Sequence, residues 1–188
     1  MLESLVSLDK ELLIFCNGLG SEQYDPFWLF ITKQLNWIPF YLVLVYCLLK
    51  KVSIKTFGVV ILTLAALIAF TDQSTNLVKY LVARPRPCNT ADILSQIRIV
   101  KCSDTLSFFS GHASNSTATM VFMFLVLRRF YKYAWLVFLF PLVFAYSRIY
   151  LTMHFPGDIL VGMLFGLCSG LLFYKIFCLI ERKYSSKL

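Results

Sequence analysis

An apolar stretch in the first half of the chain has the sequence IKTFGVVILTLAALIAF, residues 54–70. Its length approaches the roughly 20 residues that a helix needs to cross a bilayer. The polar run TDQSTN, residues 71–76, follows it directly. Polar groups at membrane depth are costly and usually mark a functional site. The stretch therefore predicts a transmembrane helix that ends beside such a site.

Four more apolar stretches accompany this one, near residues 35–50, 110–127, 133–148 and 157–177. Hydrophobic residues make up 59% of the 188 residues and charged residues only 15%, whereas soluble domains average about a quarter charged residues. Both observations indicate an integral membrane protein. Four charged side chains interrupt the first 20 residues, so we expect no cleavable signal peptide there.

The predicted fold is all-α, an integral membrane bundle of about five transmembrane helices with N-terminal interfacial amphipathic helices. Residues 4–18 mix apolar and charged positions in a helical pattern, which favours a helix lying in the membrane interface. We expect a single domain over 1–188, with interfacial helices in 1–33, the bundle in 35–177 and a cytoplasmic tail in 178–188.

The net charge of +8 comes from basic residues placed between the apolar stretches: Lys50, Lys51, Lys55, Arg128, Arg129, Lys132, Arg182, Lys183 and Lys187. Short basic loops mark the cytoplasmic side of a membrane. This placement favours anionic lipid over nucleic acid as a partner. It also predicts that segments 81–109 and 147–157, with the N-terminal region, face outward.

Reactive residues gather at the outward helix ends in three clusters. Lys79 and Arg86 are seven residues apart, about two helical turns, so both can bind one anion. Ser110, Gly111 and His112 open a predicted helix, and a helix N-terminus offers free amides and a positive dipole end to a phosphate.

The third cluster holds Arg148, His154 and Asp158. The histidine and the aspartate are four residues apart, which lets the carboxylate orient the imidazole. Together the clusters resemble the signature of the type 2 phosphatidic acid phosphatase family, Lys-x6-Arg-Pro, Pro-Ser-Gly-His and Ser-Arg-x5-His-x3-Asp. Order and spacings match, and the resemblance covers about residues 35–177. Phe109 replaces the proline of the second motif, and we expect little loss because that proline shapes a turn.

The resemblance implies a two-step reaction without a metal or other cofactor. His154 would attack phosphorus and form a phosphohistidine, and Asp158 would orient its ring. His112 would protonate the leaving lipid oxygen and then activate water. Five residues would bind the phosphate: Lys79, Arg86, Ser110, Gly111 and Arg148.

Other residues near these clusters have weaker assignments. Arg84 lies outside the motif, so a structural or headgroup contact is favoured over catalysis. Asp72, Gln73 and Asn76 either line the site or bridge helices. Two histidines with an aspartate resemble zinc ligands, but the three cationic residues beside them would repel a metal and attract an anion.

Three functions remain open. The first is a lipid phosphate phosphatase, and the second is a lipid phosphotransferase on the same scaffold. The third is a transporter or a non-catalytic lipid-binding protein, which needs no nucleophile. Candidate substrates are undecaprenyl diphosphate, phosphatidylglycerophosphate, phosphatidate and lipid A phosphates, with a slight preference for an undecaprenyl or glycerophospholipid phosphate. We expect a multi-pass protein of the bacterial inner membrane whose site faces the periplasm, in an undetermined oligomeric state.

Six cysteines are distributed unevenly. Cys88 and Cys102 lie in the predicted outer loop, and the others lie in predicted helices: Cys16, Cys47, Cys168 and Cys178. In an oxidising periplasm the loop pair is the one placed to form a disulfide, worth about 3 kcal/mol on the chain-entropy model. Two unrelated free thiols are the alternative.

Overall fold

The computed structural model describes residues 2–185, so Met1 and residues 186–188, including Lys187, lie outside the described part. All regular structure within residues 2–185 is helical. The α-helices are α1 (Leu2–Gly18), α2 (Asp25–Ile31), α3 (Ile38–Leu49), α4 (Ile54–Val82), α5 (Gly111–Leu127), α6 (Leu139–Tyr150) and α7 (Pro156–Ser185). Short 3-10 helices cover Glu22–Tyr24, Gln34–Trp37, Pro87–Asn89, Ala91–Gln96 and Ala134–Phe138.

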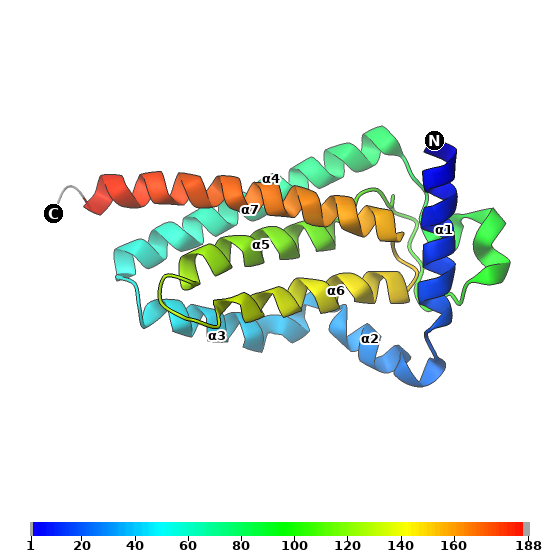
Figure 1. Cartoon of the computed structure of the whole chain (residues 1–188), viewed down its shortest axis with the longest axis horizontal. Helices are drawn as coiled ribbons and strands as arrows, with labels where there is room; N and C mark the ends of the chain where they lie inside the picture. Colours follow the sequence, from blue (N-terminus) through cyan, green and yellow to red (C-terminus); the bar gives the residue numbers. More distant parts are fainter. Residues whose placement is uncertain (1, 186–188) are drawn as a thin grey trace.

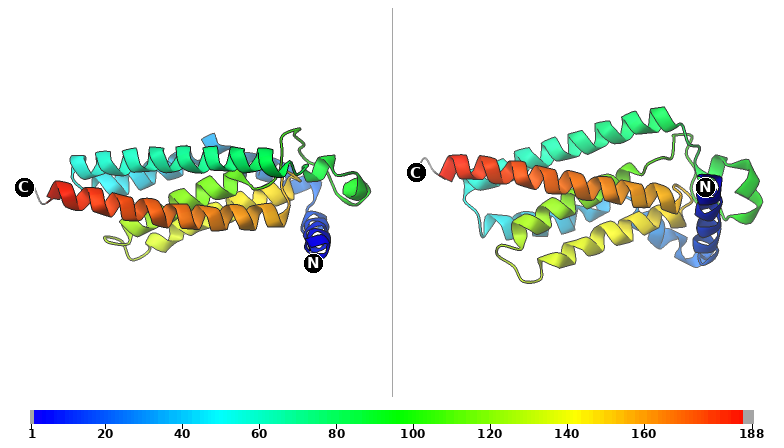
Figure 2. Two further views of the ribbon diagram at one scale, coloured as in Figure 1. Left: turned by 90° about the horizontal axis from the view of Figure 1, so that it is seen from above. Right: turned by 45° about the horizontal axis from the view of Figure 1, so that its top comes forward.

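Helices α3 to α7 run along the long axis of the molecule, and α1 lies across one end (Figure 1). Both views of Figure 2 keep α1 at that end. The end of α4, the start of α5, the end of α6 and the start of α7 meet there, while the basic turns lie at the opposite end. The sequence placed its reactive clusters at these four helix ends, so the topology brings the clusters together.

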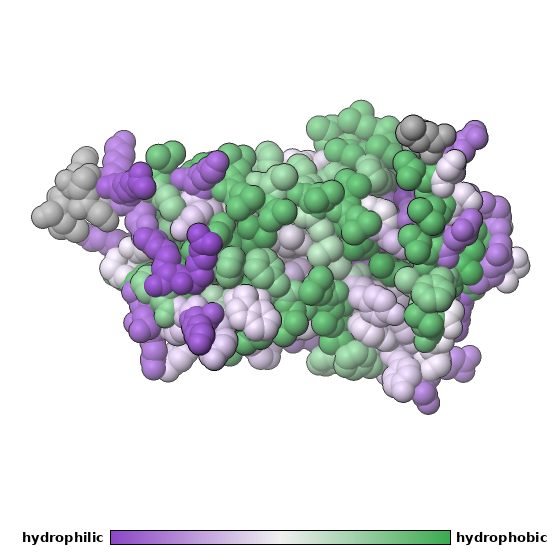
Figure 3. Space-filling model, in the orientation of Figure 1, coloured by the Kyte–Doolittle hydropathy of each residue, from purple (hydrophilic) through white to green (hydrophobic). Residues whose placement is uncertain are grey.

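On the face shown in Figure 3, an apolar belt covers the middle of the bundle, and hydrophilic residues gather toward both ends. Within the described residues, two helices that start at Ile54 and Pro156 are long and apolar enough to cross a membrane. The pair Glu22–Ile31 and Gln34–Leu49, bent by 69°, makes a third if it forms one span. The all-α membrane bundle is confirmed, and each predicted span corresponds to a helix. The count of five spans and the interfacial position of α1 stay predictions.

The boundaries of α4 follow from local chemistry. The Ser53 side chain accepts a hydrogen bond from the Thr56 amide (3.2 Å) and so caps the N-terminus. The helix ends at Ala83, whose φ of 50° lies in the left-handed region. Pro85 follows two residues later, and a proline disfavours helical backbone in the residue before it. Helical structure therefore continues through the polar run and delivers Lys79 to the last turn.

Helix α5 is the centre of the core, with Met120 and Phe122 fully buried. Three glycines spaced four residues apart bring α7 against it: Gly162, Gly166 and Gly170. A methyl group on Gly166 would lie 2.5 Å from the Ser114 carbonyl oxygen and 3.0 Å from the Ala118 nitrogen. Small residues let helix backbones approach closely in membranes. This contact fixes the position of α5, and with it His112, relative to α7.

Candidate active site

The turn between α6 and α7 shapes the third cluster. The Arg148 carbonyl accepts hydrogen bonds from the amides of Met153 (2.9 Å) and His154 (3.3 Å). Thr152 adopts a left-handed conformation with φ 57°. The turn buries His154 to 1% exposure and starts α7 just ahead of Asp158. Both side chains are thereby held at the same end of the bundle.

His154 and Asp158 form a dyad, with Nδ1 of the imidazole 3.6 Å from Oδ2 of the carboxylate. The Ser107 hydroxyl donates to the same Oδ2 and lies 3.4 Å from Nδ1. The Phe155 amide also donates to Oδ2 (3.0 Å). Because Nδ1 faces the carboxylate and the serine, Nε2 is the ring nitrogen on the side away from Asp158 and Ser107.

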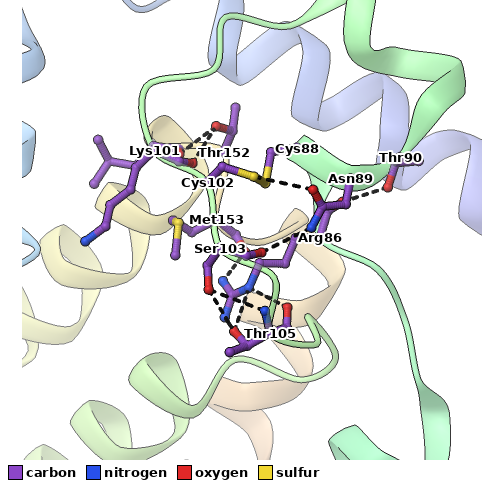
Figure 4. Close-up of a disulfide and its surroundings, with 11 residues drawn as sticks. Arg86, Cys88, Asn89, Thr90, Lys101, Cys102, Ser103, Thr105, Thr152 and Met153 are labelled. Atoms are coloured by element: carbon purple, nitrogen blue, oxygen red, sulfur yellow. Dashed lines mark hydrogen bonds between the residues drawn. A yellow bond between two sulfur atoms is a disulfide. The ribbon is translucent and has the colours of Figure 1, made fainter.

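Arg86 lies beside that nitrogen, with Nη1 3.4 Å from Nε2 of His154. The same Nη1 donates to the Met153 carbonyl (2.6 Å), and Nη2 donates to the Thr105 hydroxyl (2.7 Å). Nε donates to the Thr105 carbonyl (2.8 Å). Figure 4 shows Arg86 among these partners. A guanidinium fixed on three sides places its charge where a phosphoryl group bound to Nε2 would lie.

A disulfide supports this arrangement. Cys88 and Cys102 are joined, with their Cα atoms 5.7 Å apart, so the pairing that the sequence favoured is present in the structure. The bond ties the segment that carries Arg86 to the segment that carries Thr105 (Figure 4). The Asn89 side chain adds a hydrogen bond across the same loop, to the Ser103 carbonyl (3.2 Å).

Arg148 is 4% exposed and donates from Nη1 to the Thr32 hydroxyl (2.6 Å). Thr32 follows the end of α2, so the N-terminal region contributes to the site. The Nε of Arg148 is buried and has no hydrogen-bond partner among the described residues. A buried unpaired donor is costly, and a phosphate oxygen is a suitable acceptor for it.

His112 lies in the first turn of α5, half-buried, with its ring 5.4 Å from that of Phe144. The charges of Arg148, Lys79 and Arg86 all act on it, so the three clusters converge. His112 also lines a cavity of about 220 Å³ whose other walls are Gln34, Tyr41, Ile68, Asn115, Ser116, Thr119, Phe140 and Phe144. It therefore stands between the cationic site and a cavity between the helices.

Comparison with known proteins agrees with this geometry. The family model of the PAP2 superfamily matches residues 37–180. The chain belongs to the PAP2 superfamily. It is 32% identical over 180 residues to a lipid A 4'-phosphatase of Bacteroides thetaiotaomicron, covering 94% of this chain and 80% of the relative. It is 25% identical over 186 residues to a lipid A 4'-phosphatase of Porphyromonas gingivalis, covering 97% and 78%.

Two solved structures share the fold. Aquifex aeolicus LpxE superposes with a TM-score of 0.62 at 24% identity, covering 88% of this chain and 93% of LpxE. A transmembrane PAP2 type phosphatidylglycerolphosphate phosphatase from Bacillus subtilis superposes with a TM-score of 0.67 at 17% identity, covering 96% and 87%. Like the relatives it matches by sequence, the present chain is a membrane lipid phosphate phosphatase of the PAP2 superfamily.

The second motif of the present chain forms its turn without the proline, which Phe109 replaces. Phe109 is buried and packs its ring 5.2 Å from that of Phe165. The Ser110 amide donates to the Asp158 carbonyl (3.0 Å), and its hydroxyl accepts from the Ala113 amide (3.3 Å) as the N-cap of α5. Ser110 therefore caps α5, and Gly111 begins the helix beside it.

The polar run at the end of α4 lies partly at a second cavity, of about 380 Å³, which is lined by Asn76, Lys79, Tyr80, Asp104, Thr105 and Leu106. Asn76 also donates to Asp72 (3.3 Å) on the exposed side of the helix. Asp72 contributes a negative charge near Lys79, and Gln73 is exposed. Asn76 therefore shares a cavity with Lys79, and Asp72 contributes a charge near that lysine.

Arg84 lies outside the motif but contacts the dyad. Its Nη1 donates to Oδ1 of Asp158 (2.7 Å) and its Nη2 to Oδ2 of Asp9 in α1 (2.7 Å). Arg84 thus makes a structural contact, as the sequence favoured, and its partner is Asp158 of the dyad. Ser107 and Thr32 were not identified from the sequence, because single hydroxyl residues far from the motifs leave no local pattern. The Arg-Pro-Arg-Pro repeat around Arg84 was the one signal available.

Proposed function

We propose that this enzyme hydrolyses a phosphomonoester of lipid A at the periplasmic side of the bacterial inner membrane, through a phosphohistidine at Nε2 of His154 and without a metal cofactor. The observation that carries the proposal is the environment of His154. Its Nδ1 faces Asp158 and Ser107, while its Nε2 faces the guanidinium of Arg86. An imidazole oriented on one nitrogen presents the other to phosphorus.

In the first step a bond forms between Nε2 and phosphorus, and the bond between phosphorus and the lipid oxygen breaks. The proton that the departing oxygen needs comes from His112. Phosphoryl transfer depends mostly on positioning and on neutralising the equatorial oxygens. Lys79, Arg86 and Arg148 supply that positive charge. The Asp158 carboxylate stabilises the charge that develops on the imidazole of His154.

In the second step water attacks the phosphohistidine and His112 takes its proton. The nitrogen–phosphorus bond breaks, inorganic phosphate leaves and His154 returns to its neutral form. His112 lines a cavity of about 220 Å³, which supports its assignment as the residue that acts first as acid and then as base.

The choice of substrate is supported by the relatives, and the orientation in the membrane is supported by the distribution of basic residues. Both curated relatives named above carry the name lipid A 4'-phosphatase, which moves the preferred substrate from an undecaprenyl or glycerophospholipid phosphate to a lipid A phosphate. The basic turns between the apolar stretches lie at the end of the bundle opposite the site. Since basic loops stay on the cytoplasmic side, the site faces the periplasm in this proposal.

The test is phosphate release by the purified enzyme in detergent with EDTA present. Lipid A phosphate is compared with undecaprenyl diphosphate, phosphatidylglycerophosphate and phosphatidate. We expect lipid A phosphate to be the best substrate and vanadate to inhibit. Product analysis separates release to water from transfer to a lipid acceptor, which would instead indicate a phosphotransferase.

His154→Asn is expected to abolish turnover and the acid-labile phosphoprotein trapped by rapid quenching. Leu62→Ala, a truncation on the exposed face of α4 where Leu62 is 73% exposed, is the control and should change neither. Activity that EDTA removes and a divalent metal restores would contradict the metal-free mechanism, and residual turnover in His154→Asn would contradict the nucleophile.

A further inference from the structure

Helix α1 reaches the catalytic dyad through one side chain, Asp9. Its Oδ2 accepts from Nη2 of Arg84 (2.7 Å), whose Nη1 donates to Oδ1 of Asp158 (2.7 Å). Its Oδ1 accepts from the Gly157 amide (2.6 Å). A Cβ on Gly157 would lie 2.8 Å from the Asp9 carboxylate. Asp9 is thus in contact with both the residue before Asp158 and the cation paired with it.

Asp9, Arg84 and Asp158 form a relay of three charged groups, and all three are shielded from water. The side chain of Asp158 is fully buried, and those of Asp9 and Arg84 are 13% and 19% exposed. Arg84 also lies over the ring of Phe155, 3.9 Å from its centroid. Charges in such surroundings interact more strongly than at an open surface. With its two outer nitrogens bonded to different carboxylates and its face on a ring, the guanidinium has one orientation.

We propose that Asp9 is a positioning residue of this phosphatase, which sets through Arg84 how strongly Asp158 supports His154. The inference rests on the proposed function, because it assigns His154 as the group being tuned. In the wild type Arg84 divides its positive charge between two carboxylates. Asp158 therefore keeps enough negative charge to stabilise the imidazolium that forms when phosphorus is attacked.

Two substitutions perturb the relay in opposite senses. Asp9→Asn keeps an acceptor for Gly157 but removes the charge, so the whole charge of Arg84 acts on Asp158 and disfavours protonated His154. Arg84→Gln removes the cation and favours protonated His154. The largest other charge effects on His154 come from Arg86, Arg148 and Asp158 itself, and His112 is also in range. These are unchanged in both variants, so the difference reports the relay.

The first measurement is the titration of His154 by nitrogen-15 NMR of the imidazole in detergent, which needs no turnover. We expect its midpoint to move to lower pH in Asp9→Asn and to higher pH in Arg84→Gln, each by roughly 0.5–1 unit. The second is the pH profile of kcat/KM, in which the acidic limb should shift in the same directions. The substrate's own ionisation is common to all variants and cancels in this comparison.

Kinetically, Asp9→Asn should lower kcat about tenfold with little change in KM, the loss expected for one charge-assisted hydrogen bond. Asp9→Glu, which restores the charge, should recover part of kcat. The matched control is Lys10→Gln. Lys10 lies on α1 beside Asp9, and the substitution breaks its bond to Asp92 (2.6 Å) without touching the relay. It should leave both the titration of His154 and kcat unchanged.

Opposite shifts in the two variants with an unchanged control support the relay. Equal titrations in wild type and both variants overturn it, and so does a Lys10→Gln variant that behaves like Asp9→Asn, since α1 would then act only by general docking. A wild type that releases no phosphate refutes the proposed function alone, because the NMR titration still decides the relay.

Discussion

Gly166→Ala probes the contact between α5 and α7 most directly. The added methyl group would lie 2.5 Å from the Ser114 carbonyl oxygen, against an ordinary contact of at least 3.4 Å, so the backbones must separate by about 0.9 Å. Overpacking of this kind costs about 1–3 kcal/mol. Alanine recovers about 1 kcal/mol of helix propensity relative to glycine. A displacement near 1 Å at a reacting group costs up to about 10²-fold in rate, and α5 carries His112.

The matched control is Gly58→Ala in α4, where an added methyl group meets nothing within 4 Å. It receives the same helix-propensity gain without the collision. The free energy of unfolding of Gly166→Ala should therefore lie about 1–3 kcal/mol below that of Gly58→Ala. Thermal unfolding in detergent and phosphate release from a lipid phosphate measure the two effects. Equal melting temperatures and equal rates in both variants would refute a rigid α5–α7 contact.

Three further predictions concern the site. His112→Ala should reduce turnover of a lipid phosphate by about 10²–10⁴-fold but reduce it much less for an aryl phosphate, whose leaving group needs no acid; equal losses would remove the acid role. Reducing the Cys88–Cys102 disulfide should destabilise the enzyme by about 3 kcal/mol and lower activity, and a reductant should have no effect on the Cys88→Ser variant. Burial lowers the pKa of His154 to about 4, Arg86 adding to the shift. The neutral nucleophile therefore persists on acidification, and the acidic limb of kcat/KM should fall near pH 4 rather than 6.5 once substrate ionisation is corrected.

The sequence predicted the helices and the end of the bundle where the three clusters meet, because both depend on local or regular patterns. Apolar stretches of nearly membrane length located the helices from α3 to α7. The motif spacings located Lys79, Arg86, His112, Arg148, His154 and Asp158, which the fold brings to one end. The disulfide followed from a count of which cysteines share a loop outside the helices.

Contacts between distant residues were beyond such reasoning. Asp9 and Arg84 are 75 residues apart, and Thr32 and Arg148 are 116 apart, so neither pair leaves a periodic trace. The amphipathic pattern of α1 predicts a membrane-surface helix and does not reveal the contact of Asp9 with Arg84, because amphipathicity reports solvent exposure and not the partner of one aspartate. The glycines at 162, 166 and 170 form a small-residue repeat in the sequence, a pattern that favours close contact between helices in membranes.

On the face shown in Figure 3 the apolar belt gives way to hydrophilic residues toward both ends of the bundle, and this has an energetic consequence for a lipid substrate. Each methylene of an acyl chain moved from hydrocarbon into water costs about 0.8 kcal/mol, so withdrawing one 14-carbon chain would cost roughly 11 kcal/mol. An enzyme whose phosphate site lies at the edge of the belt avoids that expense. At such a site the lipid would arrive by diffusion within the leaflet, lose its phosphate while its chains stay immersed, and depart by the same two-dimensional route.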